Sequence, residues 1–137
     1  MKKVDSINID LVVTAVHVDG EVWMQGDLEI LINGRRPYQE EDIIDVNALL
    51  DSLEQDGEFF IFSCCCGILS CSGWEEGIKV EHKDYLVIWK DDNFNRIWTL
   101  DKTKIQKDFN EVRKEVAAYK RYFKAKEIDY VGVGYHW

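Results

Sequence analysis

Four cysteines fall within eight consecutive residues of this 137-residue chain, and their thiolates could bind a metal ion. Because adjacent residues of an extended segment point to opposite sides, Cys64 and Cys66 share one side while Cys65 points away. Cys64, Cys66 and Cys71 therefore form a candidate three-thiolate cluster, with His82 as a candidate fourth ligand. Zinc usually takes its four ligands from two C-x2–4-C pairs, but this chain has one short C-x-C and no second pair. We expect no cofactor, and a zinc site is kept as the alternative.

Other chemistry at these thiols is less favoured. Vicinal disulfides are strained, and the cytoplasmic location that we expect keeps thiols reduced. A nucleophilic Cys66 or Cys71 would need a base, and His82 is the one histidine near in sequence. Cysteine is also a small, often buried residue that suits a tight loop. We take this structural role as the leading interpretation, and a metal-binding or thiol-dependent protein as the alternative function.

The segment Phe62–Gly73 resembles the F-x-C-x-C-G-x3-C-x-G loop of a group of small uncharacterised bacterial proteins. In that group the loop also lies between a phenylalanine-rich strand and a V-x-W strand, here Val87-Ile88-Trp89. The similarity covers roughly residues 45–125, including the long helix expected near the C-terminus. The resemblance implies no activity, and Cys65 is an addition to the pattern.

Three clusters bring carboxylates together near expected turns. Neighbouring strand residues point apart, which disfavours catalysis by a carboxylate pair and favours charge that projects from the surface. Over the chain, 26 acidic and 17 basic residues give a net charge of −9; residues 1–100 carry −12 and residues 101–137 carry +3. This balance argues against general binding to nucleic acid or an anionic membrane. The uneven distribution indicates either a solvated acidic surface or an acidic face directed at a basic protein partner. The candidate partner-binding carboxylates are Glu40, Glu41, Asp42, Glu75, Glu76, Asp91 and Asp92.

The motifs that usually mark an enzyme are missing. The sequence has no glycine-rich phosphate loop, no G-x-S-x-G and no H-E-x-x-H. We therefore predict a non-enzymatic binding protein of the bacterial cytoplasm, most concretely an immunity (antitoxin-like) protein that occludes a basic toxin domain. A domain with no discrete site is the remaining alternative. Five tryptophans are many for this length, and an exposed one would mark a contact surface.

The elements that must position these residues begin with a hairpin. Ile7–Val18 and Glu21–Ile32 alternate apolar and polar residues around an Asp19-Gly20 turn, and Gly26 is expected to mark a bulge. Residues 45–55 carry an apolar helical face that Asp42 or Asp45 can cap. The apolar run Phe59–Phe62 is expected to form one central strand.

The pattern of residues in the second half of the sequence predicts an antiparallel meander followed by a long helix. Residues 77–82, 85–90 and 96–100 form short runs with tight turns, which pair as antiparallel strands. An apolar stripe from Ile105 to Phe123 predicts a helix of about five turns lying across a sheet, with Asp101 as its N-cap. The apolar tail after Tyr130 should dock on the domain.

We predict a single domain over residues 1–137, of α+β class, with an antiparallel sheet of about six strands, the long C-terminal helix packed on one face and a shorter helix beside it. No apolar run reaches the ~20 residues that cross a bilayer, and no signal peptide is expected.

Overall fold

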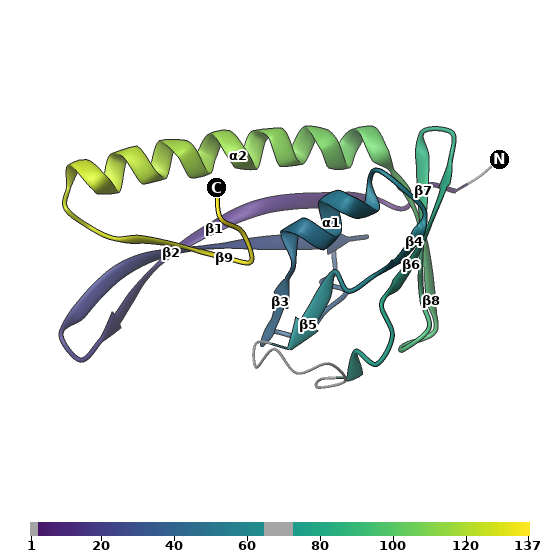
Figure 1. Ribbon diagram of the computed structural model, residues 1–137, viewed down its shortest axis with the longest axis horizontal. Coiled ribbons are helices and arrows are strands. Elements are labelled where there is room, and N and C mark those ends of the chain that lie inside the picture. The colour runs from purple at the N-terminus through teal and green to yellow at the C-terminus, as the bar shows by residue number, and fades with distance from the viewer. Residues whose placement is uncertain (1–2, 65–72) are drawn as a thin grey trace.

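The computed structural model describes residues 3–64 and 73–137, and within them the fold is α+β with mostly antiparallel strands. The described residues hold nine strands and two helices (Figure 1). Three sheets have the strand orders β1-β2-β9, β3-β5 and β4-β6-β7-β8. The fold class and the long C-terminal helix packed on a sheet are as the sequence predicts. The strands are divided among three sheets: β3 and β5 pair with each other, β4 joins the meander β6-β7-β8, and the hairpin β1-β2 pairs with β9. The strands are β1 (Ile7–Val18), β2 (Glu21–Ile32), β3 (Asp42–Ile44), β4 (Gly57–Phe59), β5 (Phe62–Cys64), β6 (Ile78–Lys83), β7 (Leu86–Asp91), β8 (Arg96–Asp101) and β9 (Tyr130–Val133).

The β1–β2 hairpin turns where the sequence predicts. Asp19 and Gly20 both have positive φ, at 49° and 81°, which matches the twist of a two-residue turn. The register runs unbroken from Ile7 opposite Ile32 to Val18 opposite Glu21, so the expected bulge at Gly26 is wrong. The glycine is needed for space instead, since a Cβ there would lie 1.9 Å from the Tyr130 hydroxyl oxygen.

The run Phe59–Phe62 forms no single strand, which corrects the prediction. Phe59 ends β4 and pairs with Ile78 of the four-stranded sheet, whereas Phe62 begins β5 and pairs with Ile44. Between them, the Ile61 carbonyl accepts a hydrogen bond from the Asp45 amide at 2.8 Å. Both faces of the run are covered, as its composition indicates, but the two ends belong to different sheets.

Both helices begin at the predicted caps. Asp45 precedes α1 (Val46–Ser52) and accepts a hydrogen bond from the Ala48 amide; Asp101 precedes α2 (Lys102–Ala125) and accepts from the amides of Thr103 and Lys104. In α2 the predicted stripe is buried except for Tyr119, which is 39% exposed. Figure 1 shows α2 lying along one face of the β1-β2-β9 sheet. The buried stripe residues are Ile105, Phe109, Val112, Val116 and Phe123.

The C-terminal tail docks as expected. Strand β9 pairs in parallel with β2, from Met24 opposite Tyr130 to Asp27 opposite Val133. Tyr135 is buried, and its hydroxyl donates to the Gly26 carbonyl at 3.0 Å. The tail therefore closes one edge of the sheet and covers part of the core that α2 and the sheet enclose. No helix among the described residues is long and apolar enough to cross a membrane.

Candidate functional site

The cysteine cluster is described only at its first member. Cys64 ends β5, is buried and lies opposite Asp42 of β3. Cys65, Cys66 and Cys71 lie outside the described residues. In residues 3–64 and 73–137, no group of three His, Cys, Asp or Glu side chains could hold a metal ion.

His82, the candidate fourth ligand, has a partner of its own. Its Nε2 lies 2.7 Å from the Ser52 carbonyl oxygen at the end of α1. Because a carbonyl can only accept, Nε2 must carry the hydrogen, and Nδ1 is left as the one ring nitrogen with a lone pair for a metal. Its backbone amide donates to Asp56 at 2.8 Å. The structure thus gives His82 a role in joining β6 to the end of α1.

The two flanks of the cysteine segment are held together by Asp42. The Oδ2 atom of Asp42 accepts a hydrogen bond from the Trp74 indole at 2.8 Å and another from the Gln39 amide at 2.8 Å. The Trp74 ring is 2% exposed and packs on Phe62, with ring centroids 5.3 Å apart. Cys64, directly before residues 65–72, and Trp74, two residues after them, are therefore both fixed to β3.

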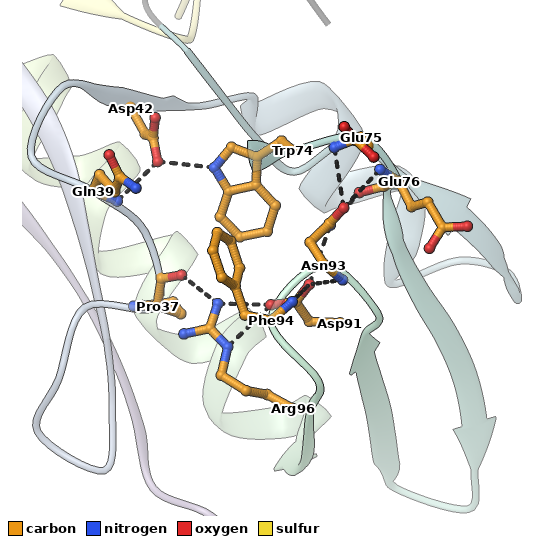
Figure 2. A network of polar contacts seen from close by, with 10 residues as sticks. All are labelled: Pro37, Gln39, Asp42, Trp74, Glu75, Glu76, Asp91, Asn93, Phe94 and Arg96. Carbon is orange, nitrogen blue, oxygen red and sulfur yellow. Dashed lines mark hydrogen bonds and ion pairs between the residues drawn. The ribbon is translucent and has the colours of Figure 1, made fainter. Parts of the chain in front are cut away.

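A second set of contacts, drawn in Figure 2, centres on Asp91 at the end of β7. Asp91 is fully buried, and its Oδ2 accepts from the Arg96 Nε at 3.0 Å and from Nη2 at 2.7 Å. Its Oδ1 accepts from the amide of Asn93 at 2.9 Å. Arg96 also donates to the Pro37 carbonyl at 2.8 Å and lies over the Phe94 ring. One buried ion pair thus ties the β7–β8 turn to the loop before β3.

Asn93 extends this network to the second acidic cluster. Its Oδ1 accepts from the amides of Glu75 and Glu76, at 3.0 and 2.9 Å, and its Nδ2 donates to the Glu76 carbonyl at 2.7 Å. Both glutamate side chains remain exposed, and Figure 2 shows the Glu76 carboxylate pointing away from the network.

The expectation that all seven candidate carboxylates project into solvent needs correction. Asp42 is 8% exposed and Asp91 is not exposed at all, because each binds buried donors of the fold. Asp92 is partly exposed and forms ion pairs with Lys79 and Lys90. The hydrogen bond from Lys79 lowers the pKa of the Asp92 carboxyl. Glu40, Glu41, Glu75 and Glu76 are therefore the four predicted carboxylates that remain available to a partner.

Glu40 and Glu41 line a groove of about 380 Å³ between β2 and β3. Asp27 and Glu29 of β2 line it as well, together with Asp42. We call this feature the acidic groove. The sequence does not predict Asp27 and Glu29 as groove residues, because no local pattern shows that the chain after β2 folds back against that strand. Their spacing of two residues, which places both on one face of a strand, is the signal that could have found them.

One cation and one phenol lie on the wall of the acidic groove. Arg36 donates to Glu29 through Nη2 at 2.5 Å and through Nε at 3.2 Å. This hydrogen bond and the Glu29 charge raise the pKa of Arg36. The Tyr38 hydroxyl accepts from the Ile30 amide at 3.1 Å, and burial raises the pKa of that phenol. Among the described residues, Glu29 is the one groove carboxylate bound by a cationic side chain, and Asp42 is buried on other donors. Asp27, Glu40 and Glu41 are left in a setting that suits an ammonium or guanidinium group from outside.

No family model, curated protein or solved structure matches this chain.

Proposed function

We propose that this protein is a non-catalytic binding protein of the bacterial cytoplasm, and most concretely an immunity protein that occludes a basic toxin domain. The acidic groove carries the proposal. It gathers Asp27, Glu29, Glu40 and Glu41 around a concave surface where Arg36 supplies one positive charge. Clefts lined by charge of one sign focus the electric field and concentrate partners of the opposite sign.

The distribution of charge over the fold supports the same function. Residues 1–100, which contain all the carboxylates of the groove, carry 20 acidic and 8 basic residues, a net charge of −12. Toxins that cleave nucleic acids need basic surfaces to hold phosphates. A carboxylate-lined surface can be steered to such a site, pair with its Lys and Arg side chains and exclude the substrate.

Inhibition of the toxin domain encoded beside this gene tests the proposal. We expect equimolar protein to abolish the activity of that domain, and the double variant Glu40→Lys/Glu41→Lys to need at least about tenfold more protein for the same effect. The matched control is Glu111→Lys/Glu115→Lys, which makes the same change of charge at exposed positions of α2.

Two results would contradict the proposal. The first is a gene neighbourhood that encodes no basic toxin domain, or one whose toxin is unaffected by the wild-type protein. The second is an equal loss of inhibition in the groove variant and in the α2 control, because net charge alone would then explain the binding.

A further inference from the structure

The β1-β2-β9 sheet has one face that α2 does not cover. In the register of the sheet, Val12, Asp27 and Val133 form one row across the three strands, and Thr14, Gln25 and Val131 form the next. Cross-strand partners share a face, so these side chains lie together. Towards the turn, Val16 lies opposite Trp23 and Val18 opposite Glu21. We call the apolar members of this surface the hairpin face: Val12, Val16, Val18, Trp23, Val131 and Val133.

The side chains of the hairpin face are exposed or partly exposed although all of them are apolar. Val12 is 39% exposed, Val131 44% and Val18 49%, and Trp23 and Val16 are partly exposed. Figure 1 shows the far end of the β1–β2 hairpin projecting beyond the rest of the molecule, with α2 on its other side. Exposed apolar side chains gathered on one face of a sheet are typical of interaction sites, since a monomer gains nothing from keeping them in water.

The charge around the hairpin face indicates what it would contact. Residues 7–32 contain five Asp and Glu residues and no Lys or Arg. Asp27 lies in a row of the hairpin face and also lines the acidic groove, which continues through Glu29 to Glu40 and Glu41. An apolar centre with a charged border is the usual anatomy of a protein interface, and tryptophan is among its most frequent anchors.

We propose that the hairpin face is the apolar half of the docking surface, with Trp23 as its anchor. Its occupant is a positively charged protein domain whose contact surface has an apolar centre bordered by Lys and Arg. This inference depends on the proposed function, because the acidic groove supplies the charged half of the same surface. Two hairpin faces packed against each other would place carboxylates opposite carboxylates, which disfavours a symmetric pair of copies of this chain.

Dissociation kinetics test the hairpin face separately from the groove. The probe is the toxin domain encoded beside this gene, made catalytically inactive and immobilised. We expect Trp23→Ala and Val131→Ser each to weaken binding at least about tenfold, mostly through faster dissociation, with a salt dependence equal to that of the wild type. Ile97→Ser is the matched control, because Ile97 is 63% exposed and lies on β8 of another sheet. It should bind as the wild type does.

Three other results of the binding experiment would each contradict a different part of the proposal. If both variants bind within twofold of the wild type while Glu40→Lys/Glu41→Lys slows association, the hairpin face is wrong and the proposed function stands. If the wild type does not bind, the proposed function fails, and this inference fails with it. If Ile97→Ser loses as much affinity, the effect is not specific to the hairpin face.

A further control concerns the occupant and the folding of the variants. Sedimentation of the wild type alone should show a monomer. Self-association that Trp23→Ala abolishes would show that a second copy of this chain occupies the hairpin face, which would contradict the proposal of a basic protein partner. Circular dichroism checks that each variant is folded. If Trp23→Ala is not folded, the binding of Val131→Ser, on β9, tests the hairpin face alone.

Discussion

Removing the Asp91 carboxylate tests the network that holds the loop before β3 against the meander. Asp91→Ala deletes the carboxylate that Arg96 Nε and Nη2 bind, so that Nη2 keeps the Pro37 carbonyl alone, and it leaves the Asn93 amide without its acceptor. Removing one member of a buried ion pair costs about 3–5 kcal/mol because the other charge is stranded. Since the Arg96 side chain is 32% exposed and can reach water, we expect the lower end of this range, a loss of about 3 kcal/mol.

The assay is urea unfolding followed by tryptophan fluorescence, which reports on the buried Trp89. With a urea dependence of about 1.5 kcal/mol per molar, a loss of 3 kcal/mol lowers the midpoint by about 2 M. Asp92→Ala is the matched control, because Asp92 is the adjacent residue and pairs with lysines at the surface. We expect its midpoint to stay close to that of the wild type.

A double-mutant cycle separates the ion pair from the rest of the network. We expect Asp91→Ala and Arg96→Ala to be strongly non-additive, so that the double variant is hardly less stable than Asp91→Ala. Additive losses, or a loss below about 1 kcal/mol for Asp91→Ala, would refute the reasoning that the buried pair stabilises this turn.

Three further outcomes follow from the packing, the titration and the cysteines. Phe109→Ala should lower the free energy of unfolding by about 3–5 kcal/mol, because Phe109 of α2 is 3% exposed. Tyr122→Ala, at an exposed position of the same helix, should change it by less than about 0.5 kcal/mol. Similar losses in the two variants would show that the apolar stripe of α2 lies outside the core. Burial and the neighbouring Tyr130 hydroxyl raise the pKa of Tyr135 above that of an unfolded tyrosine, near 10. The unfolded state therefore loses that proton first, and stability should fall as pH rises above about 10 and fall less steeply in Tyr135→Phe; equal slopes in urea unfolding would contradict this. Protein purified without added metal should contain far less than one zinc per chain, and a chelator should leave the melting temperature unchanged; stoichiometric zinc that Cys64→Ser removes would contradict the structural role of the cysteines.

The sequence predicts most strongly those elements whose signal is local. The Asp19-Gly20 turn, the Asp101 cap and the apolar stripe of α2 each depend on residues within a few positions of one another, and the structure confirms all three. Phe59–Phe62 shows where this fails, since an apolar run indicates burial but not which sheet each end joins. That is decided by distant partners such as Ile44 and Ile78.

The candidate site could be predicted only in part, because runs of carboxylates are a local signal whereas burial depends on distant partners. Runs of carboxylates mark Glu40 and Glu41, which do line the groove. The same runs contain Asp42 and Asp91, which are buried because Trp74 and Arg96 donate to them from other parts of the chain. A charged residue beside a turn looks the same in sequence whether it meets solvent or a buried donor.

The salt dependence of association with a basic toxin domain, if one is encoded beside this gene as we propose, tests the central claim most directly. If the acidic groove steers a basic partner, the wild-type association rate should fall steeply as salt shortens the Debye length from about 10 Å at 0.1 M to about 3 Å at 1 M. Glu40→Lys/Glu41→Lys should associate more slowly at low salt, with a flatter dependence, while its melting temperature stays unchanged. Equal rates and equal salt slopes in the two proteins would show that these carboxylates do not guide binding and would contradict the proposed function.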